Sequence, residues 1–371
     1  MVHPQTKATP SSPGGKGWGE GRWHVSEAEL QVTSRDNWTA PHPRPLSPKE
    51  RGDKSAPRLV LHADDFGMNA AVTAGILQAT ANGLLTSTSL LANAPAAEQA
   101  IAGWKQLDRD REAGQLASRT ARGRLDDDGS PFDLGVHLNL TQGRPLTGSR
   151  YPADFLDERG RFPGIGRLFW AWRRSAWRHR DAVWKELAAQ TTFVVDHGLR
   201  PTHLNGHQYV ELLPGLADLI LRLCDEFAIP VVRVAHEERL LQTTLRSGIG
   251  QTGNWLLALV KRHFARNFRV QMQRARQPHP DTFFGTSHAG RVDLPLLKTF
   301  LTGDFTGRIV EVGMHPGAAA NALAPTDIES GWRDPLADAR PNELVLLTSD
   351  ALARDLEVRH WRLGRLAWLA K

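Results

Sequence analysis

Short apolar runs rich in β-branched residues alternate, from Arg58 onward, with longer segments in which apolar residues recur every three or four positions. The short runs predict strands, and the helical spacing predicts amphipathic helices. The predicted strands are 59–63, 86–91, 134–140, 202–205, 230–234, a strand near 282 and 308–312; the predicted helices are 69–82, 94–104, 181–197, 215–227, 294–301 and 350–358. Strands alternating with helices favour a parallel sheet. About seven such units in roughly 300 residues favour a closed or partly closed (β/α) barrel over a doubly wound sheet.

Residues 1–56 lack this periodicity. They contain stretches rich in proline, glycine and serine at 11–17 and 41–48. Such a composition buries too little apolar surface to offset the entropy lost on ordering. We therefore expect a disordered extension over 1–56 and a single globular domain over 57–371.

Composition narrows the class of protein. The 371 residues are 40% hydrophobic and 23% charged, which is enough for one large core. The single cysteine, Cys224, excludes a disulfide framework and a cysteine-rich zinc module. The longest apolar run, at 255–260, is far shorter than the roughly 20 residues of a membrane span. No secretory signal pattern is found at the N-terminus, so we expect a cytoplasmic protein.

Basic residues cluster in two segments of a chain whose net charge is +6. Residues 251–280 contain lysines and arginines but no acid, and residues 168–180 interleave tryptophans with arginines. Both segments are typical of amphipathic helices with solvated basic faces. The alternative is contact with an anionic lipid surface or an acidic ligand. We expect no nucleic-acid partner, and a peripheral membrane contact and a homodimer stay open.

Acids and histidines collect where the predicted strands end. They are Asp64, Asp65, His137, His203, His207 and His315. The active sites of (β/α) barrels are built at this edge. Two neutral imidazoles and one carboxylate can hold zinc, iron, manganese or magnesium, and a second carboxylate can act as a base on a metal-bound water. Adjacent side chains of a strand face opposite ways, so the two aspartates converge only if the strand breaks, for which Phe66-Gly67 is suited.

Each of these residues, taken alone, also has a structural interpretation. The two aspartates can cap the following helix or shape its turn. His137 lies in an apolar strand and can be a core histidine. His203 or His207 can simply bind backbone, and His315 can be a turn residue before Pro316. One common site explains all these positions better than separate structural roles.

Five blocks of the sequence together resemble one family. They are VLHADDFG (60–67), GLLTSTSL (83–90), GVHLNLT (135–141) with GRPL (143–146), PTHLNGH (201–207) and MHPG (314–317). In this order and spacing they resemble the YdjC-like carbohydrate deacetylases, which include chitooligosaccharide deacetylases and hopanoid-biosynthesis deacetylase-like proteins. The resemblance covers about residues 58–320. It implies an α/β fold with a deformed or incomplete (β/α) TIM-like barrel forming a single catalytic domain. It also implies a divalent metal ion, Mg²⁺ or Zn²⁺, and hydrolysis of an N-acetyl group from an amino sugar.

The resemblance also implies roles for single residues. Asp65, His137 and His207 match the metal ligands, Asp64 matches the catalytic base, and His315 matches the general acid. Many members have further histidines after the last ligand. Here Gln208, Tyr209 and Glu211 stand instead, which indicates altered substrate contacts.

Substrate contacts are predicted for Arg233, His203 and Tyr209. Arg233 ends its strand and can bind a sugar hydroxyl or an anionic group, or pair with Glu237 or Glu238. Trp170, Trp172 or Trp177 can stack on a sugar or serve in the core or at the surface. The expected substrate is a small acetylated amino sugar or a glycolipid, and the basic tryptophan-rich segment favours the larger one.

Two other functions fit the same residues. Two histidines and one carboxylate also form the iron site of non-haem oxygenases, although those enzymes use a different β-fold. A carbohydrate-binding barrel without turnover is the other alternative. A serine hydrolase is not expected, because no Gly-x-Ser-x-Gly occurs.

Overall fold

Eight strands form one curled parallel sheet in the computed structural model, which describes residues 56–116, 132–237, 252–318 and 323–370. The strand order is β5-β4-β3-β2-β1-β7-β6, with β8 paired beside β2 on the same edge of β1. The strands are β1 (Arg58–Phe66), β2 (Ser87–Leu90), β3 (Asp133–Leu138), β4 (His203–Gly206), β5 (Val231–Val232), β6 (Thr282–Phe284), β7 (Ile309–Met314) and β8 (Arg362–Leu363). All described residues belong to one compact unit.

The sheet curls without closing. Within the described residues, β5 and β6 end the strand order and share no ladder. Hydrogen bonds still join their neighbourhoods: Val232 donates its N–H to the carbonyl of Pro278, and Phe283 donates to that of His236. The predicted α/β fold with an incomplete barrel is therefore confirmed.

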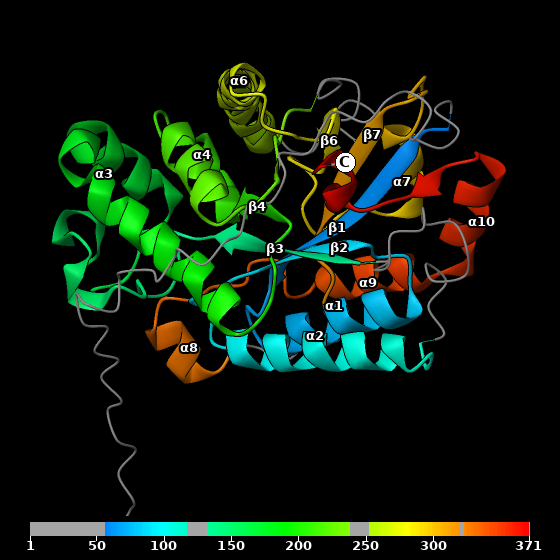
Figure 1. Cartoon of the computed structure of the whole chain (residues 1–371), viewed down its shortest axis with the longest axis horizontal. Helices are drawn as coiled ribbons and strands as arrows, with labels where there is room; N and C mark the ends of the chain where they lie inside the picture. Colours follow the sequence, from blue (N-terminus) through cyan, green and yellow to red (C-terminus); the bar gives the residue numbers. More distant parts are fainter. Residues whose placement is uncertain (1–55, 117–131, 238–251, 319–322, 371) are drawn as a thin grey trace, which may run out of the picture. The chain divides into compact units, whose positions relative to one another are not determined.

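Helices cover the outer surface of this sheet. They are α1 (Ala70–Asn82), α2 (Ala97–Glu112), α3 (Ile165–Asp196), α4 (Ala217–Glu226), α6 (Thr252–Arg274), α7 (Leu294–Phe300), α8 (Pro325–Glu329), α9 (Arg340–Thr348) and α10 (Asp350–Val358). Figure 1 shows α1 and α2 beneath the sheet, α3 and α4 at its left, and α6 above. Short 3₁₀ helices lie at Gly148–Arg150, Ala153–Phe155, His207–Leu212 and Leu366–Ala370.

Strand β1 explains how one sheet holds both a core and a site. Its side chains point alternately to the two faces. Val60 joins Val231 and Leu366 in a small apolar cluster separate from the main core. Two and four residues further along the same face come His62 and Asp64, both buried. The inner face of the sheet thus changes from apolar to polar toward the carboxyl ends of its strands.

Most predicted elements are confirmed, but α3 starts earlier than predicted, and α8, α9 and β8 were not predicted. Helix α3 starts at Ile165 rather than 181, so the tryptophan-rich basic segment forms its first half. Residues 252–274 form α6, as expected of an amphipathic segment. The predicted extension 1–56 lies outside the described residues except for Ala56.

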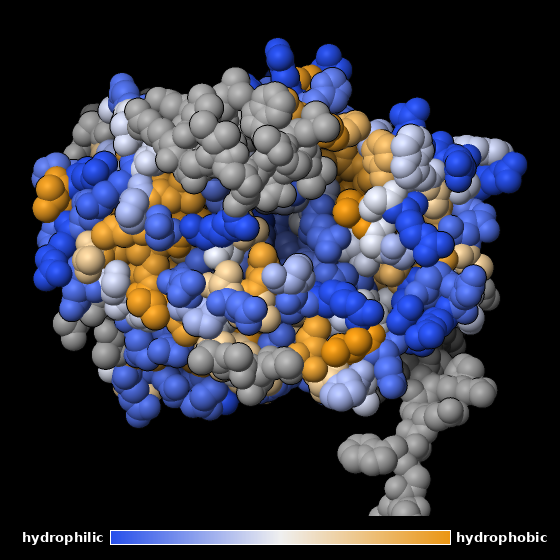
Figure 2. Space-filling model, turned by 180° about the vertical axis from the view of Figure 1, so that it is seen from behind, coloured by the Kyte–Doolittle hydropathy of each residue, from blue (hydrophilic) through white to orange (hydrophobic). Residues whose placement is uncertain are grey.

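The surface is mixed in character. Figure 2 shows hydrophobic residues in separate patches among hydrophilic ones on the rear face. In the part of the chain that the structure describes, no helix combines the length and the hydropathy needed to cross a bilayer. Helix α3 is long enough, but arginines and acids interrupt it.

Candidate active site

Asp64 and Asp65 lie side by side because β1 is irregular at this point. The strand continues to Phe66, but its pairing with β2 shifts register between Ala63 and Phe66. Asp65 adopts a left-handed backbone with φ of 68°. This bulge turns its carboxylate toward the same space as that of Asp64. The expected break is therefore real, but it occurs at Asp65 itself rather than at Phe66-Gly67.

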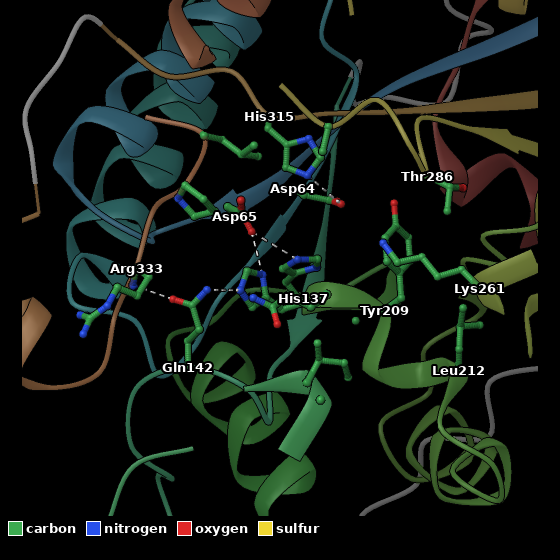
Figure 3. Close-up of a pocket in the computed structure, with 18 of the residues that line it drawn as sticks. Asp64, Asp65, His137, Gln142, Tyr209, Leu212, Lys261, Thr286, His315 and Arg333 are labelled. Carbon is green, nitrogen blue, oxygen red and sulfur yellow. Dashed lines mark hydrogen bonds and ion pairs between the residues drawn. The ribbon is translucent and has the colours of Figure 1, made fainter. Parts of the chain in front are cut away.

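Asp65 meets two histidines from neighbouring strand ends. Its Oδ1 lies 2.9 Å from Nδ1 of His207 and 3.5 Å from Nε2 of His137. The three ligand atoms lie within 4.8 Å of one another, and all three residues are buried. Figure 3 shows Asp65 and His137 pointing toward each other. The structure thus brings together the three residues predicted as metal ligands.

Outer contacts orient both imidazoles. His137 Nδ1 lies 2.8 Å from Oδ1 of Asn205, while Nδ2 of the same amide donates to Asp64 Oδ1 at 3.2 Å. The amide oxygen therefore accepts from His137 Nδ1–H, which leaves a lone pair on Nε2 toward Asp65. His207 Nε2 lies 3.1 Å from the side-chain nitrogen of Gln142. These contacts present ring nitrogens to one shared point, as a metal site requires.

The second oxygen of Asp65 is held by an arginine from a distant helix. Arg340, the first residue of α9, donates from Nη2 to Asp65 Oδ2 at 2.8 Å and from Nε to Asp334 at 2.9 Å. The same helix supplies Glu343, whose carboxylate accepts the backbone N–H groups of His315 and Val292. Helix α9 thus positions both a ligand and the predicted acid.

Asp64 lies in a separate buried network behind the three ligands. Arg233 donates from Nη1 to both of its oxygens at 2.8 Å and also contacts Glu311 at 2.7 Å. Nε2 of His62 lies 3.3 Å from Asp64 Oδ1. Nε2 of His315 lies 3.9 Å from Asp64 Oδ2. Asp64 therefore has a set of close partners that differs from that of Asp65.

Charge decides the protonation of this network. Burial opposes ionisation of Asp64, but Arg233 holds the pKa of Asp64 well below its usual range. Burial and the same arginine lower the pKa of His62 to about 3, so that ring is neutral. Burial raises the pKa of Glu311 to about 7 despite its ion pair. At neutral pH Asp64 is an oriented carboxylate.

Burial and neighbouring charges also shift the pKa values of the predicted metal ligands and of His315. Arg340 and then His207 hold the pKa of Asp65 well below its usual value, against the effect of burial. Burial would lower the pKa of His137, but Asp64 and Asp65 raise it. Burial lowers the pKa of His315 more than the neighbouring carboxylates raise it. Asp65 is therefore anionic and His315 is mostly neutral at pH 7.

A cavity of about 600 Å³ opens onto these groups. Figure 3 shows Asp64, Asp65, His137 and His315 at one end and Tyr209, Lys261 and Leu212 at the other. The outer wall is mostly apolar and comes from three elements: the start of α3, α6 and the 3₁₀ segment after β4. Its side chains are Ile165, Phe169, Trp170, Leu212, Leu213, Val260 and Phe264. A polar end and an apolar wall suit an amphipathic ligand.

Six predicted site residues line this cavity: Asp64, Asp65, His137, His207, Tyr209 and His315. Arg233 and His203 do not. Arg233 is 1% exposed and binds Asp64 and Glu311, whereas a sugar contact or a pairing with Glu237 or Glu238 was expected; Glu238 lies outside the described residues. His203 is fully buried at an edge-on contact with His62. Both point into the interior of the barrel below the cavity, which argues against direct substrate contact.

The tryptophans of α3 lie in three different environments. Trp172 is buried and donates to the carbonyl of Pro214 at 2.8 Å. Trp170 lines the cavity, and Trp177 is exposed away from it. Only Trp170 is therefore placed to stack on a ligand.

Several functional residues were not predicted from the sequence. Asn205 and Glu311 lie in predicted strands, and their inward positions follow from the two-residue period of a strand. Gln142 lies beside the GRPL block without any periodic signal. Arg340 is 275 positions from Asp65, and no local pattern could connect them.

We expect the Arg233→Met substitution to be strongly destabilising. It would leave two buried carboxylates, Asp64 and Glu311, without their cation, which typically costs about 3–5 kcal/mol. The thermal midpoint should fall by about 10 °C. Arg354→Met on the exposed face of α10 should leave it unchanged. Adding Glu311→Gln to Arg233→Met should regain part of the loss, and no regain would contradict this account of the network.

We also expect Glu211→Gln to stabilise the protein at alkaline pH. The carboxylate packs over Gly206, is 1% exposed, and burial raises its pKa to about 7. The unfolded state loses this proton near its ordinary pKa of 4.5, so stability falls as pH rises from there to about 7. Glutamine removes a penalty of roughly 3 kcal/mol at most.

The thermal midpoint of Glu211→Gln should therefore exceed that of the parent by several degrees at pH 8.5 and match it near pH 4.5. Glu226→Gln, an exposed change at the end of α4, serves as the control. A gain of equal size at both pH values would disprove the ionisation account.

Comparisons with known proteins identify the family of this chain. The family model described as YdjC-like protein matches residues 58–358. A carbohydrate deacetylase of Geobacillus stearothermophilus is 33% identical over 183 residues, or 49% of this chain and 62% of that protein. A carbohydrate deacetylase of Vibrio cholerae is 29% identical over 187 residues, 49% of this chain and 61% of that protein. The chain thus matches about six tenths of the length of these two relatives.

Two longer matches cover most of the chain. A chitooligosaccharide deacetylase of Yersinia enterocolitica is 27% identical over 308 residues, 82% of this chain and 96% of that protein. A crystal structure from Enterococcus faecalis V583, provisionally named a cellobiose-phosphate cleavage protein, superposes with a TM-score of 0.56. It has 20% identity and covers 85% of this chain and all of the other. At that identity the structural match supports the fold alone.

Proposed function

Because this chain belongs to the YdjC-like protein family, we propose that it is a metal-dependent hydrolase that removes an N-acetyl group from an amino sugar. One observation carries the proposal. A two-histidine, one-carboxylate cluster and a separate carboxylate–histidine pair face the same cavity. The named relatives that act on carbohydrates support the substrate class.

Asp65, His137 and His207 would hold a divalent cation. The fit rests on their three ligand atoms, which lie within 4.8 Å of one another, and on the contact by which Asn205 orients the ring of His137. Two nitrogens and one oxygen are a donor set typical of zinc, whereas magnesium prefers oxygen ligands. When bound, such an ion supplies a water of lowered pKa and Lewis-acid stabilisation of the oxyanion.

Side chains of the protein carry out the proton transfers of the reaction. Asp64, ionised and oriented by Arg233, takes a proton from the attacking water. His315, whose Nε2 lies 3.9 Å from Asp64 Oδ2, would receive that proton after moving within hydrogen-bond distance and deliver it to the amine nitrogen as the C–N bond breaks. Acetate and a free amino sugar are the products. Because the pKa of His315 is lowered, its protonated form would be a ready donor.

The shape of the cavity supports a substrate larger than a single sugar. Its polar end accommodates the N-acetyl group, and its outer wall offers an aliphatic and aromatic surface. Tyr209 lies at the end of the cavity away from Asp65, with Nζ of Lys261 4.4 Å from the centre of its ring. We therefore propose an acetylated amino sugar attached to an apolar group, as in a glycolipid, with Tyr209 as a substrate contact.

An acetate-release screen tests the proposal. The full chain, loaded separately with Zn²⁺ or Mg²⁺, is given an N-acetylated monosaccharide, an oligosaccharide and an N-acetylglucosaminyl lipid. Acetate and free amine should appear in equal amounts, and the lipid should give the highest kcat/KM. Sugar binding without acetate release would instead favour a carbohydrate-binding barrel. Oxygen consumption with an iron-loaded protein would favour an oxygenase.

A further inference from the structure

The first half of α3 presents an unusual face to solvent. Trp170 and Trp177 are 61% and 73% exposed, one seven-residue step apart. Four exposed arginines surround them on the same side of the helix: Arg167, Arg173, Arg174 and Arg178. No acid occurs between Ile165 and Arg180. Exposed indoles among arginines are typical of helices lying in a membrane interface, since the indole prefers the headgroup region.

Helix α6 presents a second face of similar character. Val260 and Val270 are 45% and 39% exposed, and His263, Arg266 and Arg274 accompany them. The helix contains no acidic residue. A helix adapted only to water usually carries both signs of charge and few exposed apolar side chains.

These two faces meet at the mouth of the cavity. Trp170 of α3 and Val260 of α6 both line the cavity and are both exposed. The rings of Phe169 and Phe264 pack against each other at 5.9 Å and join the two helices there. The apolar wall of the cavity is therefore continuous with the exposed apolar side chains outside it.

We propose that this α3–α6 face docks on an anionic lipid bilayer and places the mouth of the cavity at the headgroup level. The basic side chains match the charge of the bilayer, and the indoles match its interface. The docking itself is argued from the exposed residues alone. Its biological role, access to a lipid-linked amino sugar, rests on the proposed function. A purely solvated face would explain the arginines but not the exposed indoles of Trp170 and Trp177.

Co-sedimentation of the full chain with vesicles tests the docking. Vesicles of phosphatidylglycerol and phosphatidylcholine should bind the protein at low salt and release it at high salt, whereas pure phosphatidylcholine should bind weakly. The Arg173→Gln, Arg174→Gln double variant should weaken binding at least tenfold, because each basic residue near the surface contributes about fivefold. Trp177→Ser should also weaken binding at low salt, because the indole contributes to binding in addition to the arginine charges.

The control changes residues of the same kinds on another helix. Arg354→Gln with Val358→Ser removes an exposed arginine and an exposed valine from α10, which lies across the sheet from α3 (Figure 1), and should not alter binding. Turnover of a free acetylated disaccharide should be unchanged in the Trp177 and Arg173, Arg174 variants, which lie outside the cavity.

The outcomes are distinct. No binding to anionic vesicles at low salt overturns the docking, as does equal loss in the α10 control. Tighter binding to single-stranded RNA than to vesicles at equal salt also overturns it in favour of a nucleic-acid surface. Vesicle binding without any acetate release leaves the docking supported and removes only the proposed deacetylase function.

Discussion

Asp65→Asn and His137→Ala should each lose bound divalent metal and acetate release together. Each change removes one of three protein ligands whose donor atoms lie within 4.8 Å. An incomplete ligand set holds a cation weakly. Since the ion contributes several kcal/mol to the reaction, activity should fall by more than about 100-fold. Elemental analysis after dialysis, alongside the acetate assay, measures both losses.

The control for these variants is His179→Ala. His179 lies on α3, contacts Asp154 at 3.1 Å and does not line the cavity. Its loss should leave metal content and activity unchanged. Folding of every variant is checked by circular dichroism and by the thermal midpoint. Unchanged metal content in folded Asp65→Asn and His137→Ala would disprove the assigned ligand set.

Asp64→Asn should retain the metal and lose turnover. Its carboxylate contacts Arg233, Asn205 and His62, and those contacts lie outside the ligand cluster. Asparagine keeps the shape of the side chain but cannot accept the proton of the attacking water. The expected loss in kcat is about 100- to 10,000-fold, the usual contribution of a positioned base.

Metal content and kcat of Asp64→Asn are compared with those of Asp218→Asn, an exposed carboxylate on α4 that should behave as the parent. KM should change little if Asp64 acts on the water rather than on the sugar. Loss of metal in Asp64→Asn, with retention in Asp65→Asn, would reverse the two roles.

Local patterns were sufficient to predict the strand ends. Each histidine and aspartate of the site follows an apolar run, and parallel strands bring their carboxyl ends to one edge of the sheet. Hence the six strand-end residues could be grouped without coordinates, and the resemblance to the family selected Asp65, His137 and His207 from them as ligands. The resemblance to the family separated the role of Asp64 from that of Asp65, and their distinct partners in the structure are consistent with that separation.

Other residues could not be placed from local patterns. Arg233 ends a predicted strand, where a residue of a barrel is expected to face substrate. Strand β5 ends at Val232, and the guanidinium of Arg233 lies between Asp64 and Glu311 instead. The pairing of buried carboxylates with buried cations depends on how far each strand extends into the barrel. The hydrophobic periodicity of the sequence does not encode this.

The alternation of strands and helices, the edge of the sheet that carries the candidate site, and the presence there of residue types able to hold a metal ion could all be predicted from the amino-acid sequence. These follow from the positions of apolar and polar residues along neighbouring segments. Only the tertiary structure decided that β1 bulges at Asp65, that Arg340 of α9 holds this ligand, and that α3 and α6 build the apolar wall of the cavity. Those features are contacts between residues up to 275 positions apart, set by how the curled sheet and its helices pack, and short-range periodicity carries no information about them.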